Sequence, residues 1–167
     1  MEISELQNTY RSLDEVIAGY TRRLNSNYSQ IKELKKQAEG YRSTAETILD
    51  RCANEDDPNR IFDMVNQARA YNSRAEACES AIPQLERQIQ EIKGSIKGCR
   101  SKYETCIKEA RQNIQNLTTA MNKLNAISSS YGADKIKQTV IQIKQRASAN
   151  QQIANACQNR LSWIDNL

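Results

Sequence analysis

A repeat of apolar residues, at alternating spacings of three and four, runs through almost the whole chain and constrains its fold more than any other feature. In the first segment 14 of the 15 repeat positions are apolar, aromatic or cysteine, and the remaining one is Asn27. This spacing over seven heptads is typical of a coiled-coil seam, whereas an ordinary amphipathic helix follows a 3.6-residue period. The positions are Ile3, Leu6, Tyr10, Leu13, Ile17, Tyr20, Leu24, Asn27, Ile31, Leu34, Ala38, Tyr41, Ala45, Ile48 and Cys52.

Two short stretches interrupt the repeat. In NEDDPN, residues 54–59, Pro58 suits the first helical position because the N–H it lacks has no helical partner there, and Asp57 suits the N-cap before it. In SSSYG, residues 128–132, Gly132 stands where a glycine commonly ends a helix. Both stretches are predicted turns, each followed by a new helix.

The repeat resumes after each turn. A second seam runs from Ile61 to Ile127 without a slip of phase, and a third, richer in alanine, runs from Ala133 to Ile164. Short turns between long helices make sequential neighbours antiparallel. The sequence therefore predicts an all-α fold, an antiparallel coiled coil of three long helices in a single elongated domain, residues 1–167. The expected helices span roughly residues 2–53, 58–130 and 133–165.

Pro83 is an irregularity inside the second helix. It lies on the outer face, and its ring removes the backbone hydrogen bond to the Glu79 carbonyl. Folding about the first turn places it near the level of Asn27, so we expect a kink there. A four-helix bundle, with a break near Pro83 or at Gly94–Gly98, is the alternative architecture.

Three asparagines occupy inner positions of the seams: Asn27, Asn113 and Asn150. A buried amide in a seam lowers stability and can fix helix register or oligomeric state. The alternative is that these amides lie near helix ends or water and specify nothing.

Composition supports thin seams rather than a thick core. Only 38% of the 167 residues are hydrophobic, with 5 Gly and 2 Pro, and mean hydropathy is −0.78. Histidine, the commonest general base and a common metal ligand, is absent. The acidic residues at the first turn lack the spacing of a calcium loop and suit helix capping. We expect no enzyme activity, no small-molecule substrate, and no catalytic, cofactor-binding or metal-binding residues.

The stretch EIKGSIKGCRSKYETC, residues 91–106, contains two cysteines at consecutive inner positions of the second seam. On a straight helix their Cα atoms lie ~10.5 Å apart, beyond the ~7 Å that a disulfide allows, so Cys99 and Cys106 are predicted core thiols.

The chain has 5 cysteines and no C-x-x-C. With no secretory leader pattern and no bilayer-spanning stretch, we expect reduced thiols and a cytoplasmic location, although export without a signal peptide would leave no trace.

A stripe beside the second seam is a candidate surface for a protein partner or a second subunit. Folding about the first turn pairs residues whose numbers sum to about 113, and folding about the second pairs residues whose numbers sum to about 263. The N-terminal end of the first helix therefore lies opposite about residue 110. From residue 107 the apolar face of the second helix widens to include Ile107, Ile114 and Met121, which suits two neighbouring helices. The third helix covers one side, and we expect another chain to cover the other.

Charge and the lone tryptophan give two further candidates. Residues 111–167 carry seven basic and two acidic side chains. Five basic residues surround the second turn as a candidate surface for anionic lipid or an acidic partner, with a solvated helix face as the simpler interpretation. The five basic residues are Lys123, Lys135, Lys137, Lys144 and Arg146. Because no aromatic side chains are interleaved with them to stack on bases, a nucleic-acid partner is not expected.

Trp163 lies outside the seam and is either part of a packed helix end or a candidate binding anchor.

The seams favour a non-enzymatic structural or interaction protein, a scaffold, adaptor or self-assembling component that acts through helix–helix contacts. The helical hairpin and Y-G-A-D at residues 131–134 resemble the small helical proteins of type VII secretion and their acidic tyrosine signal, which implies a role in bacterial specialised secretion. The chain departs from that group in lacking W-x-G and in having a third helix. The other alternative is a peripheral membrane-surface binder, similar to phage-shock hairpins or crescent curvature sensors, using residues 123–146.

Overall fold

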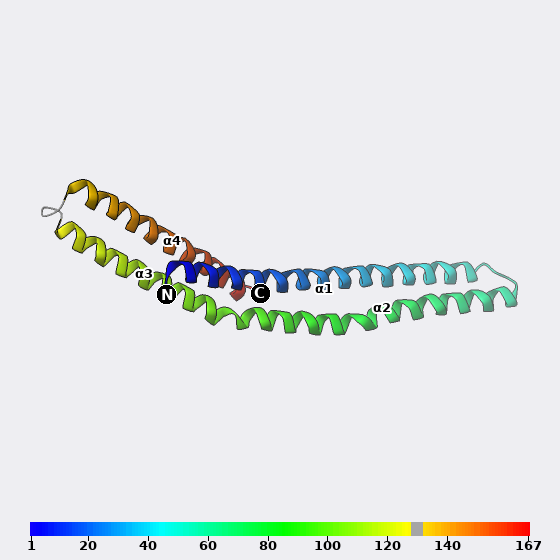
Figure 1. Ribbon diagram of the computed structural model, residues 1–167. Coiled ribbons are helices and arrows are strands. Elements are labelled where there is room, and N and C mark those ends of the chain that lie inside the picture. The colour runs from blue at the N-terminus through cyan, green and yellow to red at the C-terminus, as the bar shows by residue number, and fades with distance from the viewer. Residues whose placement is uncertain (128–131) are drawn as a thin grey trace. The chain divides into compact units, whose positions relative to one another are not determined.

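The computed structural model describes residues 1–127 and 132–167, which are almost entirely helical (Figure 1). Helix accounts for 93%, with no strand in the described part, and forms three helices of which one is bent at residue 99. The predicted all-α fold is therefore confirmed. The helical segments are α1 (Ile3–Cys52), α2 (Pro58–Gly98), α3 (Arg100–Ala126) and α4 (Ala133–Asp165), with α2 and α3 as the two limbs of the bent helix.

The heptad repeat marks the side chains that the fold buries. Every position of the first seam, from Ile3 to Cys52, is buried or half-buried. The same holds for the second seam except at Ile127 and for the third except at Ala133, which flank the connection between α3 and α4. The core thiols Cys99 and Cys106 are buried, as the repeat predicts. The period of the sequence thus identified the core.

The helices form two compact units. Unit 1 comprises Met1–Tyr20 and Gly94–Leu167, and unit 2 comprises Thr21–Lys93. The helix α1 contributes its first turns to unit 1 and the remainder to unit 2.

Unit 2 is built from two helical segments, one from α1 and one from α2, which lie side by side in Figure 1. Within Thr21–Lys93, the side chains with no more than 2% of their surface exposed are Ala45, Ala68 and Ala75. Two helices can cover only the centre of an apolar stripe, so the larger seam residues keep one edge in water. The core of unit 2 is therefore thin.

The helix that follows the turn between α1 and α2 is capped as predicted. Asp57 Oδ1 accepts a hydrogen bond from the Asn59 N–H at 3.0 Å, and the Asp57 carbonyl accepts one from the Ile61 N–H at 3.0 Å. Pro58 is the first residue of α2. The Asp-Pro pair therefore starts the helix by satisfying a free donor and by omitting another.

Unit 1 brings three helical segments together: the start of α1, the bent helix from Gly94 onward, and α4. A third segment covers the edge of the seam that two helices leave in water, so large side chains become fully buried. The largest of these are Tyr103, Leu6, Ile17, Ile96, Ile164, Asn150, Cys106 and Cys157.

The bend lies at Cys99 rather than at Pro83, where the kink was expected. The Cys99 N–H donates to the Ile96 carbonyl three residues back at 3.0 Å, while its Sγ lies 3.6 Å from the Ser95 carbonyl oxygen, to which the thiol donates. A local tightening of this kind ends one helix and starts the next. At Pro83, which is exposed, the helix continues without a break.

The second turn departs from its prediction. The helix α3 ends at Ala126 with Ile127 as its C-cap, some residues before the predicted end near 130. Gly132 does not end that helix; it is the N-cap of α4, with φ of −57° rather than the positive φ of a helix-ending glycine. Residues 128–131 of the SSSYG stretch lie outside the described residues.

Candidate functional site

A polar network joins the three helical segments of unit 1. One carboxylate oxygen of Asp14 on α1 accepts hydrogen bonds from the Arg160 Nη2 of α4 at 2.7 Å and Nε at 3.1 Å. The same oxygen lies 3.5 Å from the Tyr103 hydroxyl of α3, which donates to it. Charge-assisted hydrogen bonds of this kind are directional, so they favour one alignment of the three segments.

Burial changes the acidity of the groups beneath this network. Tyr103 has none of its surface exposed, and its burial, followed by the nearby Asp14 carboxylate, raises the pKa of the phenol. Burial also raises the pKa of Tyr10, with Asp14 again the second cause. Both phenols therefore stay protonated, and the Tyr103 hydroxyl acts as a hydrogen-bond donor.

Two buried thiols lie next to each other between α3 and α4. Cys106 and Cys157 are hydrogen-bond neighbours, and both are free and almost completely buried. Burial and the adjacent Cys106 raise the pKa of Cys157 to about 12, and burial raises the pKa of Cys106 as well. Such thiols behave as small core residues and are poor nucleophiles.

The seam asparagines hydrogen-bond across the helices. Asn113 Nδ2 donates to Asn150 Oδ1 at 3.0 Å and to the Met1 carbonyl at 2.9 Å. Asn150, which is 1% exposed, donates in turn to the Arg146 carbonyl. In unit 2, Asn27 Nδ2 donates to Gln88 Oε1 at 3.3 Å. These amides satisfy one another, which supports a role in fixing register.

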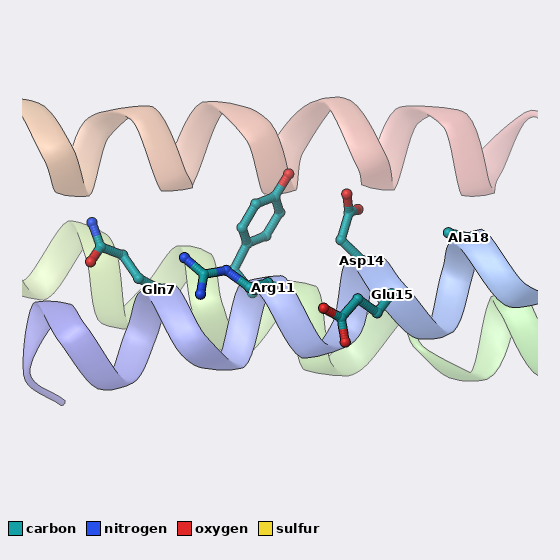
Figure 2. A pocket seen from close by; sticks show the side chains of 6 residues that line it. Gln7, Arg11, Asp14, Glu15 and Ala18 are labelled. Carbon is teal, nitrogen blue, oxygen red and sulfur yellow. The ribbon is translucent and has the colours of Figure 1, made fainter.

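A shallow groove runs along α1 in unit 1. Figure 2 shows Gln7, Arg11, Asp14, Glu15 and Ala18 on this helix, with the Asp14 carboxylate pointing toward α4. The groove is lined by two carboxylates, of which Asp14 is already engaged by Arg160, and by the Tyr10 phenol, whose raised pKa keeps it protonated.

The candidate stripe beside the second seam is only partly open. Ile107 is buried in unit 1, in a groove that Gln158 and Leu161 of α4 also line. Ile114 and Met121 are half-buried. Of the three predicted residues, the last two therefore retain surface that another chain could contact.

The five basic candidates are all exposed, and none forms an ion pair with another residue in the part of the chain that the structure describes. They do not share one face. Arg146 lines a groove with Ile3 and Gln7 of α1, whereas Lys137 and Lys144 are separated by two helical turns on one face of α4. Lys123 lies on α3 and Lys135 at the start of α4.

Trp163 is half-buried near the end of α4. The Arg160 guanidinium lies over its ring, 5.2 Å from the ring centroid. The same guanidinium binds Asp14, so the tryptophan ring packs against the polar network.

Two features of this region were not predicted from the sequence. Asp14 and Arg160 flank the seams, and their pairing depends on how three helices align, which the repeat alone does not give. The second feature is a set of large exposed apolar residues outside the seam, among them Phe62, Leu49 and Ile141. An apolar residue off the seam was the signal that could have identified them.

The described residues contain no cluster of three or more Cys, Asp or Glu side chains that could hold a metal ion. Among the described helices, none combines the length and apolar character needed to cross a bilayer. Tyr131 of the Y-G-A-D stretch lies outside the described residues.

No protein-family model, curated protein or solved structure matches the chain. A functional conclusion therefore rests on the residues described above.

Proposed function

We propose that this chain is a non-enzymatic interaction protein, an antiparallel coiled coil that acts as a scaffold, adaptor or self-assembling component through helix–helix contacts. The observation that carries the proposal is the alignment of the heptad repeat with buried and half-buried side chains at every described repeat position except Ile127 and Ala133. The side chains at the centre of the fold are used for packing, and the remaining surface is helical.

The antiparallel arrangement is supported by contacts between residues far apart in the sequence. In unit 2, the Tyr41 and Tyr71 ring centroids lie 6.2 Å apart, and Gln37 lies opposite Cys78. In unit 1, Asn113 meets Asn150 and Arg100 meets Asp165. In each unit a lower residue number in one helix pairs with a higher residue number in the next, as two antiparallel helices require.

The contact with another protein is expected at the half-buried part of the stripe. Ile114 and Met121 share one side of α3 and keep part of their surface in water. A helix whose apolar stripe is wider than its own neighbours cover can accept one more helix. The proposal is that a second subunit or a helical partner packs there.

Multi-angle light scattering of protein purified from its native host tests the proposal. We expect a mass above the 19.0 kDa of one chain, or a co-purifying protein, and loss of either in the Ile114→Glu/Met121→Glu variant. The matched control, Gln115→Glu/Asn122→Glu, adds the same charge at exposed positions of the same helix and should have no effect. A single monodisperse monomer without a partner contradicts the proposal.

A further inference from the structure

We infer that the chain binds further copies of itself through two surfaces of opposite charge, a basic strip on α4 and an acidic strip on α1. The basic strip is Lys137, Ile141 and Lys144, and the acidic strip is Glu46, Leu49 and Asp50. This inference rests on the proposed function and goes beyond it, because it names a second copy as a partner and adds a contact at residues outside the Ile114 and Met121 surface.

The basic strip lies on one exposed face of α4. Its three residues follow at spacings of four and three, so they are neighbours along the helix. Ile141 is 55% exposed between two lysines, and neither lysine has an ion-pair partner among the described residues. Between Glu109 and Asp165, the sequence has one acidic residue, Asp134. The surrounding potential is therefore positive, and an acidic partner with an apolar side chain fits it.

The acidic strip lies on the last turns of α1, in unit 2. Leu49 is 45% exposed beside Glu46 and Asp50, and neither carboxylate forms an ion pair with a described residue. The stretch 46–63 carries six acidic and two basic residues. One of the two basic residues, Arg60, already lies 3.9 Å from both Glu55 and Asp57. The local potential is therefore negative.

The strongest apolar feature of this end is Phe62, the only phenylalanine of the chain. It lies on the first turns of α2 with 66% of its surface exposed. Val65 follows three residues later and is half-buried on the same side of the helix. Exposed aromatic and aliphatic side chains within a charged rim are the usual composition of an interface core.

The two strips match in charge. Each presents one large exposed apolar side chain beside two like charges, and the charges of the two strips have opposite signs. Docking one on the other buries Leu49 and Ile141 and sets the two lysines against the two carboxylates. Because the two strips differ, the contact is heterologous, and an assembly of any length keeps one unpaired strip of each kind at its ends.

An anionic membrane is the competing ligand for the basic strip. A helix that lies on lipid presents a broad apolar face below its basic residues. On this face of α4 the neighbours of Ile141 at 138 and 145 are glutamines, so a single apolar residue would enter the bilayer. The acidic strip of another copy therefore fits the basic strip better.

Sedimentation velocity over a range of protein concentrations, at low and high ionic strength, tests the inference. We expect association that increases with concentration and weakens about tenfold between 50 and ~500 mM salt, since charge pairs at an exposed contact are screened. Circular dichroism of each variant shows that it remains helical.

Charge reversal gives the sharper result. The variant Lys137→Glu/Lys144→Glu and the variant Glu46→Lys/Asp50→Lys should each associate at least about tenfold more weakly when alone, because each then carries two strips of the same sign. Mixed in equal amounts they should associate again, since each presents the charge that the other lacks. The control Lys32→Glu/Lys36→Glu carries the same charge change on an exposed part of α1 and should behave as the unaltered chain.

Three results would overturn the inference. One is a monomer at every concentration and ionic strength. A second is association that the strip variants leave unchanged but Ile114→Glu/Met121→Glu abolishes; this would leave the proposed function intact and reject the strips. The third is binding to phosphatidylserine vesicles that is lost in Lys137→Glu/Lys144→Glu without any self-association, which would assign the basic strip to membranes.

Discussion

Unit 1 and unit 2 share one heptad repeat but bury it to different depths. In unit 2 the most deeply buried side chains are alanines, and the isoleucines and leucines of its seam retain some exposed surface. In unit 1 a tyrosine, two cysteines, an asparagine and four large aliphatic side chains are fully enclosed. The difference follows from the number of helical segments, since three enclose a stripe that two only line.

The ion pairs of the units differ in the same way. In unit 2, Arg42 forms a bidentate pair with Glu79, at 2.8 and 3.0 Å, on the exposed surface. In unit 1, the Asp14–Arg160 pair is less exposed and also receives the Tyr103 hydroxyl. The same kind of contact therefore ties two helices on the surface of one unit and three helices near the core of the other.

The largest contrast should come from truncating a core tyrosine in each unit. Tyr103→Ala removes a fully buried ring and should lower the free energy of unfolding of unit 1 by about 3–5 kcal/mol. Tyr71→Ala removes a half-buried ring from unit 2 and should lower it by about 1–2 kcal/mol. Urea titration followed by circular dichroism, with Trp163 fluorescence reporting on unit 1, measures both. Equal losses would contradict the difference in burial.

Thiol labelling should separate the units next. At pH 8 and under native conditions, Cys106 and Cys157 should react with iodoacetamide at least about 100-fold more slowly than Cys78 of unit 2, because they require an opening of the fold. The raised pKa of Cys157 also withholds the thiolate. Mass spectrometry of the labelled peptides over time gives the rates, and labelling of all three cysteines at one rate would show that unit 1 opens freely.

The same thiol has a consequence for pH. In the unfolded chain a cysteine has its ordinary pKa of 9.0, whereas the folded Cys157 has one of about 12. Between these values the unfolded state loses a proton that the folded state keeps. The contribution of this thiol to stability is therefore fully present below pH 9 and is lost as the pH rises toward 12. Cys157→Ala should reduce this loss in urea titrations at pH 8 and pH 10.

A smaller effect should come from removing the carboxylate that joins three helices. Asp14→Ala leaves the Arg160 guanidinium and the Tyr103 hydroxyl without their shared acceptor, and should destabilise unit 1 by about 1–2 kcal/mol. Glu15→Ala, at an exposed neighbouring position, is the control. Glu79→Ala in unit 2 should have a weaker effect than Asp14→Ala, since its partner stays solvated. The reverse order would refute the assignment of the Asp14 network.

The smallest expected effect is a gain. Gly40 lies inside α1 in unit 2, and a methyl group added there would meet nothing within 4 Å. Gly40→Ala should therefore stabilise unit 2 by about 0.5–1 kcal/mol through the lower entropy of the unfolded chain. Gly94→Ala, which is equally unobstructed in unit 1, should show the same gain by urea titration. A loss at either position would indicate a contact that the folded helices do not show.

Much of the fold was readable from the sequence because heptad spacing and turn chemistry are local. The seam from Ile3 to Cys52 and the Asp57 cap both follow from a few neighbouring residues. The bend was assigned to Pro83 because proline removes a hydrogen bond, but an exposed proline disturbs a helix less than the tightened turn at Cys99. Gly132 was misassigned because a glycine between two helices can end one or precede the next.

The site was less predictable for a physical reason. The contact of Asp14 with Arg160 depends on the alignment of α1 with α4, which are distant in the sequence and have no turn between them. Ile107 appeared open in the repeat because the repeat shows which face is apolar and not how far a neighbouring helix extends over it.

Amide hydrogen exchange, resolved by residue, tests most directly whether a third helical segment gives one half of the chain its deeper core. We expect the slowest exchange at Leu6–Ile17, Ile96–Ala110 and Ile153–Ile164, with residues 24–89 exchanging at least about tenfold faster. Protection that is uniform along all the helices, or that is greatest between residues 24 and 89, would contradict it.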